Sequence, residues 1–288
     1  MSLKAKIHDY RMKLLAPVMS ELDSLYKNMV FLVDNTVDIG QVESKPSIKR
    51  QQIEIYELLE GIDRFMSEQD FDYFLFFGTL LGCVRHGGFV PWDDDIDIGM
   101  LQEDFEKLLE KEHLLKDYGL ILSSPFSPRK HYPKGGWHKL YFDENGKNIT
   151  IFVFDLVECE DLKSFQEQRL ANQQKAADIR EKFKKGKIGF DKCRDQLSAR
   201  IQKHWARVEV RTKENASAAT YMTKSILSST EYTVVPFHTV FPLKKAPFVV
   251  KENQAKTDYP VPNTPEAFFE NFYGKNYMHF PKDIFPRH

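Results

Sequence analysis

The feature that most constrains the fold is a run of aspartates directly after an apolar, glycine-marked stretch, FGTLLGCVRHGGFVPWDDDIDIGM at Phe77–Met100. Asp93, Asp94, Asp95 and Asp97 stand within five consecutive residues. Carboxylates this close repel one another, so a structured chain that keeps them needs a counter-charge nearby. That counter-charge is a metal ion, a basic side chain or only water, and the surrounding sequence has to discriminate among the three.

The residues before the aspartates predict a helix and then a strand. In Ile55–Met66, apolar residues recur at spacings of three and four, which is typical of an amphipathic helix. Phe71–Phe77 is apolar on both faces and ends at Gly78, which predicts a central strand buried on both sides. A turn-rich loop, GCVRHGGFVPW, is then expected to lead into the aspartates.

The aspartates themselves show strand periodicity. Asp95 and Asp97 alternate with isoleucines, so both carboxylates are expected on one face and the isoleucines on the core side. An amphipathic helix, EDFEKLLEKEHLL, follows. Ile149–Glu158 is predicted as a third strand that is apolar on both faces except for Asp155. These elements together predict a mixed α/β (α+β) fold.

Residues 161–215 differ in character, with fifteen Lys or Arg against eight Asp or Glu. They predict a pair of charged helices that breaks near KKGKIGF. One interpretation is a solvated helical insertion, and the other is a basic surface that faces a phosphorylated ligand or lipid-linked acceptor. Further on, NTPEAFFENFYG predicts a short helix with Thr264 as N-cap, Pro265 at the first position and Gly274 as its stop.

Composition excludes several classes of protein. The net charge of −1 gives no general electrostatic case for nucleic acid as a partner. The longest apolar runs are too short to span a bilayer, and the first residues lack the apolar core of a secretory signal. The three cysteines are odd in number, widely spaced and match no zinc pattern. We therefore expect a cytoplasmic protein without a transmembrane segment, leaving open a peripheral contact with the inner face of the membrane.

Hard oxygen ligands such as Asp95 and Asp97 suit Mg²⁺ or Mn²⁺, which bind through a few carboxylates plus substrate phosphates. Asp155 is the natural third carboxylate if its strand lies beside theirs. Gly78 would let a phosphate approach the backbone, and Thr79 would add a hydroxyl donor. The combination favours a metal site for a phosphate-bearing substrate.

The alternative is a solvated acidic loop that is paired with basic side chains. Arg85, Lys134 and Lys139 are the residues that would supply those charges.

The Phe77–Met100 stretch resembles the characteristic segment of the LicD family, which includes fukutin-like proteins. FPLKKAPF and VPNTPEAFFENFYG resemble the closing segment of that family. The resemblance is strong over residues 71–110, weaker over 137–160 and 236–280, and absent over 1–45 and most of 161–215. It implies a nucleotidyltransferase-like fold, in which a mixed sheet is flanked by helices and metal-binding carboxylates stand on adjacent strands.

The third strand departs from the family pattern. Family members often carry Asp-Ile-Phe-Pro-Leu-Asp there, whereas this chain reads ITIFVFDLVECED. Asp155 can be aligned with the first Asp of that pattern, and a shifted alignment places Thr150 there instead. We assign Asp155, because the site needs a carboxylate.

The resemblance implies a role for each candidate residue. Asp95 and Asp97 would bind one or two Mg²⁺ or Mn²⁺ ions, and Asp93 and Asp155 would complete the metal shell. Asp155 would also orient an acceptor hydroxyl and take its proton.

Donor phosphates would be held by a second set of residues, each of which also has a purely structural interpretation. Arg85 and His86 sit in the predicted loop, where a salt bridge to the aspartates is the alternative. Lys139 would reach phosphate or extend to solvent. With Gly78 and Thr79, these residues make up the predicted donor site.

The expected protein is a single LicD-like catalytic domain over residues 1–288. Its parts are N-terminal helices (1–68), a metal-site core (69–160), a basic helical insertion (161–215) and a closing segment (216–288). The resemblance implies a phosphotransferase that moves a substituted phosphate from a CDP-linked donor to a hydroxyl of a cell-surface glycan and releases CMP. The group would be of the phosphocholine, phosphoethanolamine, phosphonate or polyol-phosphate type, and the acceptor a glycan or lipid-linked glycan of capsule or lipopolysaccharide biosynthesis.

Two alternatives stay open. One is a nucleotidyltransferase of the same core that uses an NTP and releases pyrophosphate. The other is a catalytically idle glycan-binding protein that kept the fold.

Overall fold

The structure is a computed structural model that describes residues 15–22, 24–29, 42–123, 137–142, 146–205, 208–224, 234–250 and 257–279. The chain divides into two compact units, one formed by residues 44–275 and the other by residues 1–43 with 276–288. In the smaller unit, residues 15–22 and 24–29 are helical, in agreement with the predicted N-terminal helix. Everything that follows concerns the larger unit.

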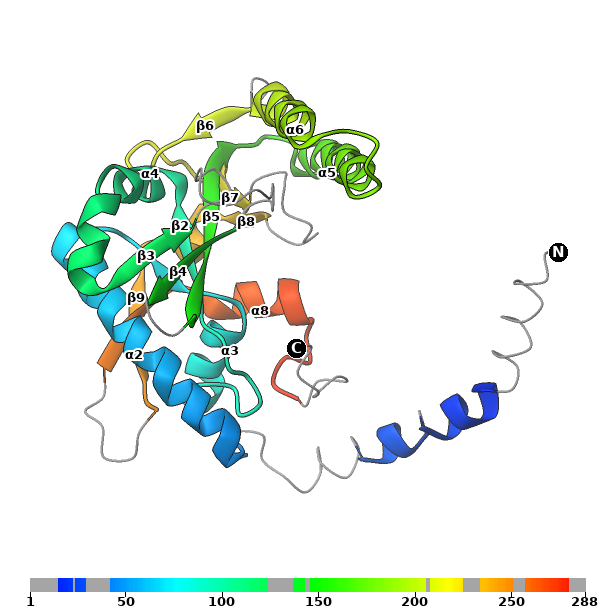
Figure 1. Cartoon of the computed structure of the whole chain (residues 1–288), viewed down its shortest axis with the longest axis vertical. Helices are drawn as coiled ribbons and strands as arrows, with labels where there is room; N and C mark the ends of the chain where they lie inside the picture. The colour runs from blue at the N-terminus through cyan, green and yellow to red at the C-terminus, as the bar shows by residue number, and fades with distance from the viewer. Residues whose placement is uncertain are drawn as a thin grey trace. The chain divides into compact units, whose positions relative to one another are not determined.

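The main sheet of the larger unit is mixed and is centred on β5 (Figure 1). The strands follow the order β1-β2-β5-β4-β3, while β6 and β7 also pair with β5, and β8 pairs with β7. β2 and β5 run parallel, whereas the other strand pairs of this sheet among the described residues are antiparallel. A separate pair is formed by β9 and β10. The bounds are β1 Phe74–Leu75, β2 Asp97–Leu101, β3 Leu120–Ser123, β4 Trp137–Phe142, β5 Asn148–Glu158, β6 Glu209–Arg211, β7 Thr220–Lys224, β8 Val234–Pro236, β9 Lys244–Phe248 and β10 Thr257–Val261.

Helices flank this sheet, so the predicted α/β (α+β) class is confirmed (Figure 1). None of the helices among the described residues is long and apolar enough to cross a bilayer. The bounds are α2 Pro46–Gln69, α3 Phe77–His86, α4 Gln102–Glu110, the 3₁₀ helix η2 Glu112–Tyr118, α5 Leu162–Lys184, α6 Phe190–Trp205, α7 Phe237–Val240 and α8 Pro265–Tyr273.

Phenylalanine rings form the core between the sheet and α8. The Phe76 ring centroid lies 5.2 Å from that of Phe154 on β5 and 5.8 Å from that of Phe268 on α8. Such edge-to-face pairs are worth about 0.5–1.5 kcal/mol each beyond the area that they bury. The predicted helix at 265–273 is confirmed, with Thr264 before it and Gly274 after it, although the Thr264 side chain makes no capping hydrogen bond.

The prediction of a central strand over Phe71–Phe77 was wrong. The strand is only two residues long, and it lies at the β1 end of the strand order, beside β2. Its residues are buried because α8 packs its phenylalanines against the sheet: the Phe268 ring lies 6.3 Å from that of Phe74. The continuous apolar sequence therefore predicted correctly that this segment is buried, but it predicted a central position in the sheet, which is wrong.

The first part of the predicted loop, residues 82–86, is instead the end of a helix, α3. Gly82 lies inside it, and a Cβ there would meet the Gly88 carbonyl oxygen at 2.5 Å. The helix ends at Gly87, whose φ of 64° is left-handed and favours glycine. Two glycines that predicted turns thus have other roles: Gly82 permits a close packing contact, and Gly87 ends the helix.

The second strand is shorter than predicted, since β2 begins only at Asp97. Asp93, Asp94 and Asp95 lie in the irregular segment before it. The isoleucines at 96 and 98 are fully buried, as expected.

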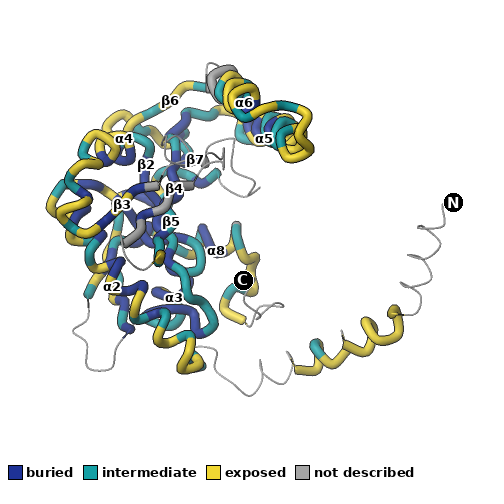
Figure 2. Tube along the Cα trace, in the orientation of Figure 1, coloured by how far each residue is buried: buried dark blue, intermediate teal, exposed yellow. Residues whose placement is uncertain are grey.

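The basic region from 161 to 205 forms the expected pair of helices, α5 and α6, which break between Lys184 and Phe190. They pack on each other around the small cluster of Ala176, Cys193 and Leu197, and much of their remaining surface is exposed (Figure 2). The region then continues into a strand, β6, which the sequence did not indicate.

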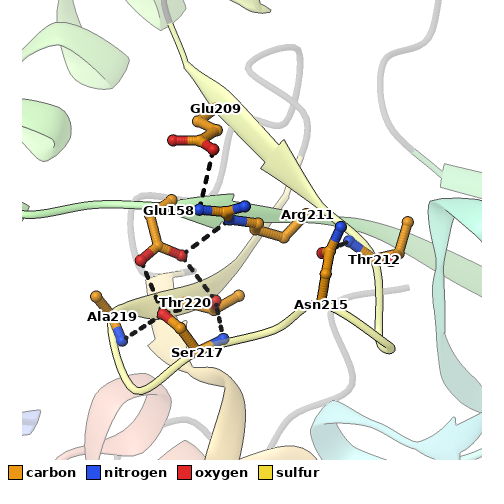
Figure 3. Close-up of polar contacts among 8 residues, drawn as sticks. All are labelled: Glu158, Glu209, Arg211, Thr212, Asn215, Ser217, Ala219 and Thr220. Carbon is orange, nitrogen blue, oxygen red and sulfur yellow. Dashed lines mark hydrogen bonds and ion pairs between the residues drawn. The ribbon is translucent and has the colours of Figure 1, made fainter.

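Polar contacts at the end of β5 join the chain after this insertion to the sheet (Figure 3). The Glu158 carboxylate accepts hydrogen bonds from Ser217 Oγ at 2.7 Å, Thr220 Oγ1 at 3.0 Å and Arg211 Nε at 3.2 Å. The Ser217 hydrogen bond and the other contacts lower the pKa of Glu158, because they favour its charged form. β6 and β7 are thereby fixed beside β5.

Candidate functional site

Asp97, the first residue of β2, is hydrogen-bonded to the start of α3. The backbone amide of Asp97 donates to Thr79 Oγ1 at 2.9 Å, and the amide of Phe76 donates to the Asp97 carbonyl at 2.9 Å. Thr79 is only 2% exposed. Its hydroxyl therefore positions the acidic strand, and its predicted contact with a donor phosphate stays a prediction.

Gly78, in the first turn of α3, makes room for an aspartate. A Cβ at this position would lie 2.4 Å from Asp93 Oδ2, closer than any real contact allows. The loop that carries Asp93 is held from the other side, because the Gln52 amide donates to the Asp93 carbonyl at 2.7 Å and to the Val90 carbonyl at 3.2 Å. The Asp93 carboxylate thus lies against the positive end of a helix.

The carboxylates of the acidic segment, Asp93–Asp97, are close enough to perturb one another. Burial, followed by the charge and hydrogen bond of Asp95 and the charges of Asp97 and Asp94, raises the pKa of Asp93 to about 8. Such crowding is what a divalent cation would relieve, so the donor chemistry fits Mg²⁺ or Mn²⁺. Within the described residues, however, no group of three or more His, Cys, Asp or Glu side chains is arranged to hold a metal ion.

Tyr273, the last residue of α8, also belongs to this site, and the sequence did not single it out. Although Tyr273 is 41% exposed as a whole residue, desolvation around its hydroxyl, followed by the charges of Asp97 and Asp93, raises the pKa of that hydroxyl above the usual value. The ring of Phe272 packs 4.8 Å from that of Phe77 at the start of α3, which fixes the end of α8 beside the acidic segment. The available signal is the Tyr-Gly pair that ends FENFYG, which predicts a helix end and belongs to the segment that resembles the family's closing segment, without indicating a role for Tyr273.

Arg85 and His86 lie in the last turn of α3 rather than in a loop. Arg85 Nε donates to His86 Nε2 at 2.9 Å, and its guanidinium lies 5.9 Å from the centroid of the Trp92 ring. Burial lowers the pKa of Arg85 to about 10. Its predicted phosphate contact stays a prediction.

Asp155 is not beside Asp97, the aspartate of β2. In the parallel pairing of β2 with β5, Asp97 faces Thr150, and Leu101 faces Phe154. Asp155 thus lies five residues beyond the partner of Asp97, roughly 16 Å along the strand. Burial, with a smaller contribution from Glu106 on α4, raises the pKa of Asp155 to about 7.

The register supports the shifted alignment, which puts Thr150 next to Asp97. The assignment of Asp155 rests on the need of the site for a carboxylate, and strand pairing places Asp155 five residues further along β5 than the partner of Asp97.

The remaining predicted residues are placed less fully. Lys139 is opposite Thr150 in the antiparallel pairing of β4 with β5, so its backbone lies in the same cross-strand row as Asp97. Nothing is described of its side chain, and Lys134 lies outside the described residues.

The chain is similar to several known proteins. Residues 70–157 match the family model LicD, described as LicD/FKTN/FKRP, nucleotidyltransferase domain. The chain is 34% identical over 122 residues to the uncharacterized protein RT0683 of Rickettsia typhi, covering 41% of this chain and only 34% of that protein. It is 22% identical over 221 residues to the lipopolysaccharide cholinephosphotransferase LicD of Haemophilus influenzae, covering 71% of this chain and 73% of that protein.

A shorter match joins the chain to ribitol 5-phosphate transferase FKRP of Homo sapiens, with 53% identity over 32 residues, 11% of this chain and 6% of that protein. The matched family segment contains α3, the acidic segment, β2 and nearly all of β5. Residues 70–157 are therefore similar to the nucleotidyltransferase domain of the LicD family.

Proposed function

We propose that this protein is a metal-dependent phosphotransferase. It would move a substituted phosphate from a CDP-linked donor to a hydroxyl of a cell-surface glycan and release CMP. The observation that carries the proposal is the acidic segment, whose carboxylates crowd together against the first turn of α3 inside the LicD domain. Relatives named as a cholinephosphotransferase and a ribitol 5-phosphate transferase support transfer of a substituted phosphate to a glycan.

The residues of the proposed site have two kinds of role: the carboxylates would hold a cation, and the helix amides and Tyr273 would offer hydrogen bonds. Asp95 and Asp97 would hold a divalent cation, with Asp93 beside them, and that cation would offset the negative charge of the diphosphate and of the departing CMP. The first turn of α3 presents backbone amides and the positive end of the helix dipole, which attract phosphate. Tyr273 is protonated at neutral pH, as a tyrosine with a pKa near 10 ordinarily is, and would be a neutral hydrogen-bond donor at the edge of the site.

The acceptor would approach as a glycan or lipid-linked glycan. Of the two interpretations of the insertion, the basic surface would suit such an acceptor if it carries phosphate. We propose that the reaction takes place on the cytoplasmic side of the membrane.

The test is CMP release from a panel of CDP-linked donors, with Mg²⁺ or Mn²⁺ against EDTA and with a mixed glycan extract as acceptor. Asp97→Asn removes one carboxylate charge and should lower turnover at least about a hundredfold. Asp117→Asn is the matched control, since Asp117 is exposed on η2 and should leave turnover unchanged. Metal-dependent release from one donor, lost only in Asp97→Asn, would support the proposal and identify the transferred group.

Other outcomes would support the alternatives. Pyrophosphate release from an NTP, with no CMP from any CDP-linked donor, would make the protein a nucleotidyltransferase. Glycan binding that is unaffected by EDTA and by Asp97→Asn, without turnover, would make it an idle glycan-binding protein.

A further inference from the structure

The row of residues that crosses the sheet at Asp97 contains a single carboxylate. Asp97 faces Thr150 on β5, Thr150 faces Lys139 on β4, and Lys139 faces Ser123 on β3. On the other flank, the Phe76 amide donates to the Asp97 carbonyl. The carboxylates near Asp97 therefore come from its own segment, and the neighbouring strands contribute none in this row.

Asp97 and Thr150 share one face of the sheet. Ile96 and Ile98 are fully buried on either side of Asp97, and Ile149 and Ile151 are fully buried on either side of Thr150. Side chains alternate between the two faces of a strand, so the half-exposed Asp97 and Thr150 point the same way. Neighbouring strands are about 4.8 Å apart, which places residue 150 where a second strand would supply a ligand.

A hydroxyl at this position changes what the site can bind. Two divalent cations about 4 Å apart repel strongly and need negatively charged ligands on both flanks. Thr150 is neutral, so the β5 flank offers no charge to a second cation. Even one cation is incompletely held by residues of a single segment, in line with the lack of a complete metal-binding group among the described side chains.

We propose that the acidic segment binds a single divalent cation, and that the diphosphate of the donor completes its coordination from the Thr150 side. This inference rests on the proposed function. The free protein then binds the cation weakly, and cation and nucleotide strengthen each other's binding, as thermodynamic linkage requires.

Mn²⁺ binding to the full chain tests this without any turnover. The free Mn²⁺ signal in electron paramagnetic resonance gives stoichiometry and affinity, measured with and without CDP as the diphosphate probe. The wild type should bind about one Mn²⁺ per chain, and CDP should tighten that binding about tenfold or more. Asp97→Asn should abolish the effect of CDP.

Thr150→Asp supplies the missing charge, and Thr150→Asn is its uncharged match of similar size. Thr150→Asp should bind Mn²⁺ in the absence of CDP about tenfold more tightly than Thr150→Asn. Circular dichroism checks that both variants fold, and the wild-type measurement with CDP decides the question even if Thr150→Asp does not.

Three results would overturn the inference. They are two Mn²⁺ ions per wild-type chain, Mn²⁺ affinity that CDP leaves unchanged, and equal affinities in the two folded Thr150 variants. If Mn²⁺ binds tightly without CDP and Asp97→Asn abolishes it, the proposed metal-dependent function stands and only this inference fails. No Mn²⁺ binding to any variant, with or without CDP, would overturn the proposed function as well.

Discussion

At the scale of single residues, the acidic segment needs room for its side chains as well as a balance for their charge. Gly78 has an unremarkable backbone, and its role comes from the Asp93 carboxylate that occupies the position of a Cβ. Asp155, by contrast, is a half-buried residue away from this cluster. Both residues were predicted to act on the ligand, and the structure gives each of them a consequence that can be measured separately.

Gly78→Ala should weaken the metal site with little effect on the fold. The added methyl would meet Asp93 Oδ2 at 2.4 Å, and the carboxylate at the end of a flexible side chain can move away. We expect Mn²⁺ affinity in the presence of CDP to fall about tenfold, with a change below about 1 kcal/mol in the free energy of unfolding. Gly189→Ala is the control, since nothing lies within 4 Å of its Cβ position. Unchanged Mn²⁺ affinity in Gly78→Ala would show that Asp93 does not support the site.

Asp155 should make the protein less stable as pH rises. Its folded pKa of about 7 lies above the unfolded value of about 3.9, so the folded state favours the protonated form. The stability this provides is complete below pH 4 and is lost as pH rises to about 7. Asp155→Asn should therefore be more stable than the wild type by about 2–4 kcal/mol at pH 8, with the difference vanishing near pH 4.

Urea unfolding at several pH values measures this difference. Asp117→Asn, at an exposed position, should track the wild type throughout. A difference between Asp155→Asn and the wild type that does not vary with pH would contradict the raised pKa.

At the scale of elements, an ion-pair cluster attaches the segment between β6 and β7 to α4. Lys213 Nζ lies 2.9 Å from Asp104 Oδ2 and 2.7 Å from Asp72 Oδ2. Asp104 is almost completely buried, and Lys107 on its own helix also reaches it, at 3.2 Å. A buried carboxylate that loses a partner costs more free energy than an exposed one.

Lys213→Met should lower the free energy of unfolding by about 1–3 kcal/mol, because Asp104 would then keep only Lys107. Lys107→Met, which removes the more exposed lysine, should cost less than about 1 kcal/mol. Chemical denaturation of both variants provides the comparison, and adding Asp104→Asn to Lys213→Met should restore part of the loss. Equal costs for the two lysines would contradict the placement of Lys213 as the main partner of Asp104.

At the scale of the whole molecule, the three cysteines lie in different parts of the fold and differ in their exposure to solvent. Cys83 on α3 and Cys193 on α6 are buried, and Cys159 is partly exposed after β5. Burial, with a contribution from Asp258, raises the pKa of Cys83 to about 12. Buried thiols that stay protonated are unreactive.

A thiol reagent should therefore modify one cysteine readily in the native protein and all three in denaturant. Cys159→Ser should remove the readily reacting thiol, whereas Cys193→Ser should leave it. Rapid modification of Cys83 in the folded protein would contradict the packing of α3 against β9.

Much of the local structure followed from the sequence, since periodicity and caps are properties of neighbouring residues. The apolar stripe of α2, the buried β5, the break between α5 and α6 and the proline and glycine that bound α8 were all predicted from single segments. The acidic segment, too, was identified from its own residues. Its run of aspartates is recognisable from the local sequence, whatever the fold of the rest of the chain.

The tertiary structure alone decided which residues meet. Thr150 rather than Asp155 faces Asp97 because the parallel register of β2 and β5 is set by packing between segments about fifty residues apart. Tyr273 joins the site because α8 folds back on α3 through phenylalanine contacts. A chain reveals by itself which side chains carry charge and which segments bury their faces. Distances between distant segments depend on how all of those faces pack at once, and no local pattern contains that information.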